Sequence, residues 1–111
     1  MTWPPGGNLI DLSADGDEIR VQVWHGVQGH EIEGFSIQLL TTVDGEQRQV
    51  VRYDNSHGSY PHRDILNWDG STQRQVRMRD GLTVTEAFEE ALDAMFDNWR
   101  QYVIDFMQRR P

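Results

Sequence analysis

The C-terminal part of the chain constrains the fold most, because it is predicted to form one long helix with a single apolar side. Apolar residues recur at every third or fourth position from Phe88 to Met107, which is the spacing of a helix that buries one face. Thr83 and Glu86 form the pattern of a capping box, in which each side chain accepts a hydrogen bond from the other residue's backbone N–H. The sequence therefore predicts a helix over residues 84–109, and the residues before it must cover its apolar face.

The residues before the helix alternate between apolar and polar side chains, which is typical of half-buried β-strands. An Asp-Gly pair at residues 44–45 separates two such runs and is a strong signal for a tight hairpin. Residues 1–17, with their prolines and glycines, indicate an irregular N-terminal arm, and residues 18–111 indicate a single domain. We expect an α+β fold, with a four- to five-stranded, mainly antiparallel sheet and one long C-terminal amphipathic helix packed on one face. The expected strands cover residues 18–27, 33–43, 46–53, 64–68 and 73–79.

The composition excludes several classes of site. The chain has no cysteine, so disulfides, thiolate metal sites and a cysteine nucleophile are all ruled out. No apolar run approaches the roughly 20 residues needed to span a bilayer, and the start of the chain has no secretion signal, so a cytoplasmic protein without membrane contact is expected. The net charge of −8 opposes non-specific binding to nucleic acid. No residue pattern indicates a cofactor.

The polar side of the predicted strands is rich in arginine and glutamine, whereas acidic residues predominate in the helix. The sequence therefore predicts a polarised molecule, with an Arg/Gln sheet face and an acidic helix back. In one interpretation the sheet face is solvated or forms a homodimer, with Trp24, Leu40 and Val50 as a contact patch. In the other, Trp24, Arg48 and Arg77 belong to a platform for single-stranded RNA or DNA. The polar residues expected on this face are Arg20, Gln22, Trp24, Ser36, Gln38, Arg48, Arg52, Gln73, Gln75, Arg77 and Arg79.

Residues 50–64 gather the side chains best suited to chemistry, at a point where a strand runs into a polar loop. In an acid–base site, His57 and His62 would move protons during phosphodiester cleavage. Arg52 and Arg63 would hold the phosphate and stabilise the charge that develops on it.

Two other interpretations of the same stretch stay open. A metal site would use nitrogen and oxygen ligands within eleven residues, although their spacing matches no tight motif. A structural role would use Asp54 and Asn55 as turn formers that hold the loop. The metal-ligand candidates are Asp54, His57, His62 and Asp64.

The string Arg52-Tyr53-Asp54-Asn55-Ser56-His57-Gly58, followed by His62-Arg63-Asp64, resembles a group of small prokaryotic domains. In these domains a strand ends in a YDN motif, followed by a glycine and a His-Arg-His-like exit, and the TumE-like toxins of toxin–antitoxin pairs belong to the group. The specific resemblance covers residues 50–64, and it implies an RNA-directed activity and an antitoxin-like protein partner. Asp64 stands where the family has its second histidine, which argues against a three-histidine metal or ribonuclease site.

Together these observations favour a small toxin–antitoxin or defence-type protein that acts on RNA or on a partner protein through residues 52–64. The sequence leaves open whether the protein is an enzyme, and a ribonuclease is the candidate if it is one. One alternative is a non-enzymatic module that binds a protein or forms a homodimer through the open sheet face. A metal-binding domain is the second alternative.

Overall fold

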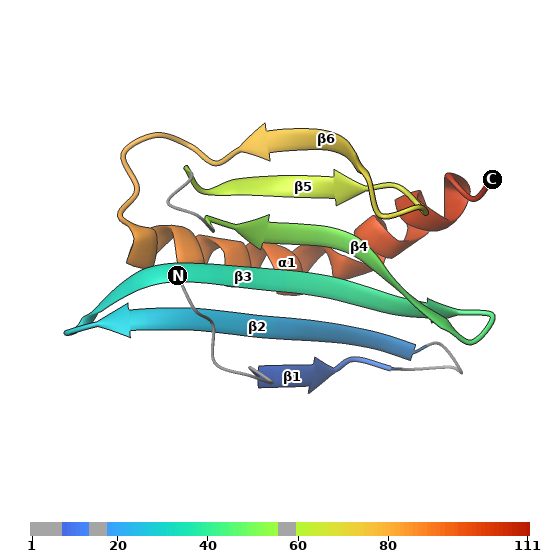
Figure 1. Cartoon of the computed structure of the whole chain (residues 1–111), viewed down its shortest axis with the longest axis horizontal. Coiled ribbons are helices and arrows are strands. Elements are labelled where there is room, and N and C mark those ends of the chain that lie inside the picture. Colours follow the sequence, from blue (N-terminus) through green and yellow to red (C-terminus); the bar gives the residue numbers. More distant parts are fainter. Residues whose placement is uncertain (1–7, 14–17, 56–59) are drawn as a thin grey trace.

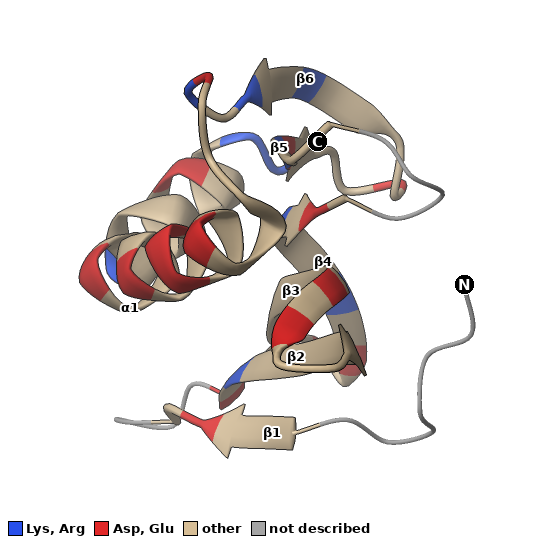
Figure 2. Cartoon of the chain, turned by 90° about the vertical axis from the view of Figure 1, so that its left-hand side faces the viewer, with Lys and Arg blue, Asp and Glu red and all other residues tan. Residues whose placement is uncertain are grey.

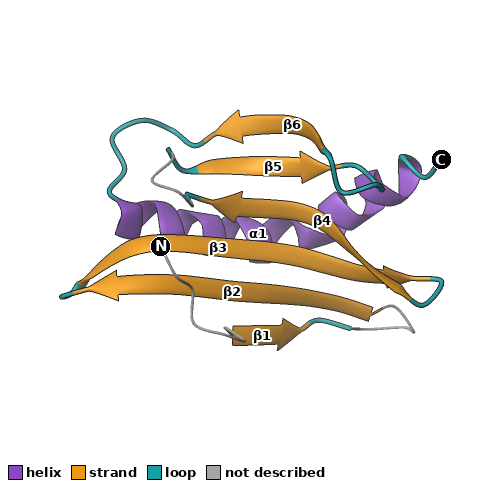
Figure 3. Ribbon diagram, in the orientation of Figure 1, coloured by secondary structure: helices purple, strands orange, loops and turns teal. Residues whose placement is uncertain are grey.

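The computed structural model describes residues 8–13, 18–55 and 60–111, which form one antiparallel sheet and one helix (Figures 1 and 3). The strands follow one another across the sheet in chain order, and each is antiparallel to its neighbours. The elements are β1 (Asn8–Asp11), β2 (Glu18–Gln28), β3 (Glu31–Val43), β4 (Glu46–Asp54), β5 (His62–Leu66), β6 (Thr72–Arg77) and α1 (Val84–Gln108). The predicted α+β class, antiparallel sheet and C-terminal helix are confirmed, but the sheet has six strands instead of four or five.

The additional strand, β1, lies in the segment that the sequence predicts to be an irregular arm. Leu9 pairs with Gln22 and Ile10 with Val21, so β1 extends the sheet beyond β2. Ile10 and Leu12 also pack against the core. A strand of four residues is too short for the alternation of its side chains to be read from the sequence.

The core lies between α1 and the middle strands of the sheet. Phe35, Ile37 and Leu39 of β3 are fully buried, and α1 packs mainly on β3 and β4. Ala87 and Ala91 are fully buried on the facing side of α1, and small side chains allow a helix to approach a sheet closely. Each large apolar side chain buried here contributes about 1.5–3 kcal/mol of transfer free energy.

Both ends of α1 are fixed by specific contacts. The predicted capping box is confirmed, because Thr83 Oγ1 accepts from Glu86 N at 3.1 Å and Glu86 Oε1 accepts from Thr83 N at 3.0 Å. At the other end, the Trp68 ring stacks on Phe106 with 4.6 Å between centroids, and Trp68 Nε1 donates to the Phe106 carbonyl at 2.8 Å. The described helix is not long and apolar enough to cross a membrane.

A β-bulge in β4 changes which side of the sheet its first residues face. Leu39 pairs with Val51 but Leu40 pairs with Gln49, so Val50 is an extra residue between them. Val50 is fully buried with Val51, and its predicted place in an exposed contact patch is therefore wrong. Arg48 also lies on the helix side, where its guanidinium stands 5.0 Å from the centre of the Trp68 ring and donates to the Trp68 carbonyl at 2.6 Å.

The predicted polarity of the two faces is only partly correct. Most acidic residues of α1 do lie on the side away from the sheet (Figure 2). The sheet face, however, is less basic than expected, because Arg48 lies on the helix side and Arg79 pairs with Glu90 of α1. A second irregularity, between Ile65 and Leu66, makes Gln73 an extra residue of β6, and its side chain lines a cavity on the helix side.

Candidate functional site

The face of the sheet that α1 does not cover, here called the open face, brings four charged residues of β4 and β5 together. Arg52 pairs with Asp64, and Asp54 pairs with His62, so the four side chains form two adjacent cross-strand pairs on one face. They are the charged cluster: Arg52, Asp54, His62 and Asp64. The same rows continue to Gln38 and Ser36 on β3 and to Gln75 and Arg77 on β6.

Each carboxylate of the charged cluster contacts both Arg52 and His62. Arg52 Nε lies 3.0 Å from Asp54 Oδ2, and Arg52 Nη2 lies 2.8 Å from Asp64 Oδ2. His62 Nε2 lies 3.1 Å from Asp54 Oδ1 and 3.4 Å from Asp64 Oδ2. Gln75 Nε2 donates to the remaining oxygen of Asp64 at 3.0 Å, so both oxygens of that carboxylate are held.

The hydrogen bonds of His62 indicate its chemical state. Nδ1 is 2.8 Å from the Tyr60 carbonyl oxygen, which can only accept, so Nδ1 carries a proton. Among the described residues, the partners of Nε2 are carboxylate oxygens of Asp54 and Asp64. The geometry therefore fits an imidazolium that donates from both nitrogens, or a neutral ring whose Nε2 binds a cation held by the same carboxylates.

The two carboxylates of the charged cluster are buried although no helix covers them. Asp64 is 2% exposed and Asp54 is 6% exposed. Burial raises the pKa of Asp64, but the hydrogen bonds from Arg52 and Gln75 and the charge of His62 outweigh it and hold the pKa below its ordinary value. Buried ion pairs add little net stability to a fold, and buried clusters of titratable groups are frequent at functional sites.

The structure separates the residues that the sequence predicts to act together. His62 and Arg52 share the charged cluster, whereas Arg63 lies on the helix side and donates to the Tyr102 hydroxyl at 3.2 Å. His57 lies outside the described residues. Neighbouring residues of a strand point to opposite faces, so His62 and Arg63 could not both reach the open face.

The predicted binding residues also divide between the two faces. Trp24 lies on the open face in the cross-strand row of Ser36, Asp54, His62 and Arg77. Arg77 stands over the Tyr60 ring, 3.7 Å from its centre. Arg48, as described above, lies on the helix side.

Asn55, predicted to be a turn former, is hydrogen-bonded to β3. Its Oδ1 accepts from Phe35 N at 2.8 Å, and its own N–H donates to the Phe35 carbonyl at 3.3 Å. Asn55 is buried and continues the pairing of β3 with β4 beyond the last residue of the strand. It therefore fixes the point where the chain leaves the sheet next to the charged cluster.

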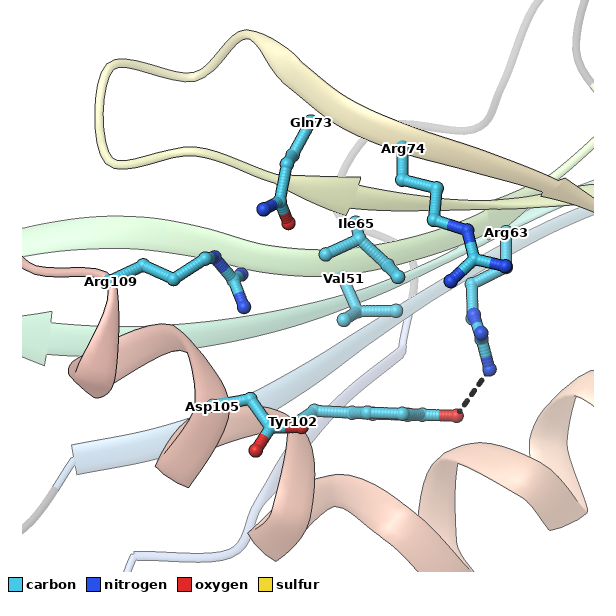
Figure 4. Close-up of a pocket in the computed structure, with 8 residues that line it drawn as sticks. All are labelled: Val51, Arg63, Ile65, Gln73, Arg74, Tyr102, Asp105 and Arg109. Carbon is cyan, nitrogen blue, oxygen red and sulfur yellow. Dashed lines mark hydrogen bonds between the residues drawn. The ribbon is translucent and has the colours of Figure 1, made fainter.

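A second group of arginines, which sequence reasoning did not find, lies on the helix side of β5 and β6. Arg63, Arg74 and Arg109 line a cavity of about 420 Å³ next to Tyr102 (Figure 4). Val51, Ile65, Gln73 and Asp105 complete its lining. Only the alternation along β5 and β6 could have indicated that Arg63 and Arg74 share a face, and the extra residue Gln73 obscures that pattern.

The fold and the site together define a small α+β domain in which one helix covers one face of an antiparallel sheet and a charged cluster lies on the other. The chain belongs to a family of domains of unknown function, DUF7718, whose model matches residues 8–111. No curated protein and no solved structure matches the chain.

Proposed function

We propose that this domain is a small toxin–antitoxin or defence-type protein that acts on RNA at its open face, with His62 as the residue that transfers a proton. The observation that carries the proposal is the position of His62 Nε2, which lies 3.1 Å from Asp54 and 3.4 Å from Asp64 beside Arg52. An imidazolium held in this way is oriented by its neighbours, as a general acid must be.

The row of side chains on either side of His62 supports RNA as the substrate. Trp24 lies at the β2 end of the row, and Arg77 lies at the β6 end against Tyr60. Exposed aromatic rings stack on unpaired bases, and arginine binds phosphate. The row spans roughly 19 Å, since neighbouring strands are about 4.8 Å apart.

The proposed reaction is cleavage of a phosphodiester by the neighbouring 2′-oxygen. The 2′-oxygen attacks phosphorus and the bond from phosphorus to the 5′-oxygen breaks. The imidazolium of His62 turns its Nε2 proton from the Asp54 and Asp64 carboxylates and gives it to that leaving oxygen. The products are a 2′,3′-cyclic phosphate and a 5′-hydroxyl. Arg52 and Arg77 would attract the phosphate, and His57 stays the predicted acceptor of the 2′-proton.

The test is cleavage of an end-labelled single-stranded oligoribonucleotide, followed on a denaturing gel. We expect His62→Asn to reduce the rate by about 100-fold or more, the usual contribution of a general acid. The matched control is His30→Asn, because His30 is exposed in the turn between β2 and β3, and it should cleave at the wild-type rate.

Two further measurements complete this test. A 2′-deoxy substitution at the scissile position should abolish cleavage, and thermal melting should show that both variants fold. Equal rates for His62→Asn and His30→Asn, with both proteins folded, would refute the proposed role of His62.

A second candidate function, a divalent-cation site, is favoured by one specific observation. Ligand atoms of Asp54, His62 and Asp64 all lie within 4.8 Å of one another, and the Tyr60 carbonyl fixes the other nitrogen of His62, as is common for metal-binding histidines. The Arg52 guanidinium, which pairs with both carboxylates, opposes a second cation at the same place.

Thermal melting with Zn²⁺ or Mn²⁺ separates the two candidates, because a bound ion must raise the melting temperature. A cation site predicts a rise that is lost in Asp64→Asn and kept in Asp93→Asn, which changes an exposed carboxylate of α1. The proposed general acid predicts RNA cleavage that survives a chelator.

The partners predicted from the sequence, an antitoxin-like protein or a second copy of the chain, stay predictions. The contact patch expected for a homodimer loses Val50, which is fully buried. Sedimentation over a range of concentrations measures self-association directly, and a monomer at the highest concentration would count against the dimer.

A further inference from the structure

The cavity on the helix side of β5 and β6 gathers positive charge that this acidic protein does not neutralise. Arg63, Arg74 and Arg109 line it together, in a chain of net charge −8. None of the three forms an ion pair within the described residues. The one carboxylate in the lining, Asp105, accepts a hydrogen bond from Gln101 at 2.8 Å.

The hydrogen-bonding capacity of these arginines is only partly used. Arg63 donates to the hydroxyls of Tyr102 and Tyr53, and Arg109 donates to the Leu66 carbonyl at 3.1 Å. The Nε groups of Arg63 and Arg109 are buried without an acceptor among the described residues. No described residue accepts a hydrogen bond from the Arg74 side chain. The exposed guanidinium of Arg74 is therefore free to donate hydrogen bonds to an anionic group bound in the cavity.

The cavity has a cationic end and an apolar floor. In Figure 4, Arg63 and Arg74 reach from β5 and β6 at one end, Arg109 and Asp105 lie at the other, and Val51 and Ile65 lie between them. The Tyr102 ring lies along the side next to Arg63 (Figure 4). The cavity is large enough for a small organic ligand, since its volume of about 420 Å³ falls within the usual range for such sites.

We propose that this cavity binds a small phosphomonoester, with its phosphate between Arg63 and Arg74 and its carbon part against Tyr102, Val51 and Ile65. Two guanidinium groups offer the paired donors that match phosphate oxygens. The site does not depend on the proposed RNA activity, because it lies on the opposite side of the sheet from the charged cluster.

The experiment measures binding of AMP, inorganic phosphate and adenosine to the full chain by titration calorimetry. We expect AMP to bind more tightly than phosphate, and adenosine not to bind. Arg74→Gln should weaken AMP binding by at least tenfold, because a hydrogen bond to a charged group is lost. Arg74 is exposed, so this substitution should leave the fold intact, which thermal melting checks.

Arg100→Gln is the matched control, because it removes the same charge from an exposed position of α1 outside the cavity. It should change AMP affinity less than twofold. Three results would each overturn the proposal: no binding of AMP up to about 10 mM, AMP binding no tighter than phosphate, or equal losses in Arg74→Gln and Arg100→Gln.

Discussion

The side chain of Asp64 is buried on the open face, where strand residues ordinarily meet solvent. It is 2% exposed on a face without a covering helix, and Arg52, Gln75 and His62 all contact its carboxylate. Burial raises the pKa of Asp64, but these contacts together lower it by more than burial raises it. The folded-state pKa therefore lies below the ordinary value of 3.8. The contribution of Asp64 to stability is therefore complete above pH 3.8 and is lost as the pH falls through the lower folded-state pKa.

We predict that Asp64→Asn lowers the free energy of unfolding by about 2 kcal/mol at pH 7, because the buried carboxylate loses its charged hydrogen bond with Arg52. The difference from the wild type should shrink as the pH falls from 3.8 through the lower folded-state pKa, below which the wild-type carboxyl is neutral in both states. Urea unfolding at a series of pH values measures this. The exposed Asp93→Asn should change stability by less than about 0.5 kcal/mol, and a constant difference for Asp64→Asn at all pH values would refute the prediction.

At the residue scale, the sequence predicts which residues belong to the site, but it does not predict which face of the sheet each of them reaches. Arg52, Asp54, His62 and Asp64 were all candidates, and the structure places them in one cluster. The roles assigned to Arg63 and His62 could not be realised on one face, because adjacent strand residues alternate. The sequence predicts a loop at residues 62–63, whereas both residues belong to β5 and therefore alternate between its two faces.

At the scale of elements, irregularities in the strands decide which residues reach each face. The alternation along β4 predicts that Val50 faces solvent. The bulge opposite Leu39 and Leu40 instead places its side chain in the core, next to Val51. The same shift moves Arg48 to the helix side. A bulge depends on how two strands pair, so a periodicity measured along one strand does not predict it.

We predict that Val50→Ala costs about 2 kcal/mol of stability, because two buried methyl groups are lost and a cavity remains. Val27→Ala is the control, since Val27 is a strand residue of the same type that is 56% exposed. Its effect should be below about 0.5 kcal/mol. Chemical denaturation compares the two variants, and a Val50→Ala protein as stable as Val27→Ala would show that Val50 faces solvent.

At the scale of the whole molecule, net charge describes this protein poorly. The chain carries −8 overall, yet acidic residues concentrate on the outer side of α1, and arginines line a cavity on the other side of that helix. The class of fold could be predicted because one amphipathic helix and several alternating runs allow few arrangements. The acidic outer side of α1 could also be predicted, but the division of the arginines between the two sheet faces could not, since it depends on two shifts of strand register.

The central claim is that RNA binds on the open face, and photo-crosslinking tests it most directly. An oligoribonucleotide that carries 4-thiouridine is irradiated with the protein, and the modified tryptic peptides are identified by mass spectrometry. We predict crosslinks in the peptides 21–48 and 53–63, which contain Trp24 and Tyr60. Crosslinks confined to peptides 80–100 and 101–109, which cover α1, would contradict the account.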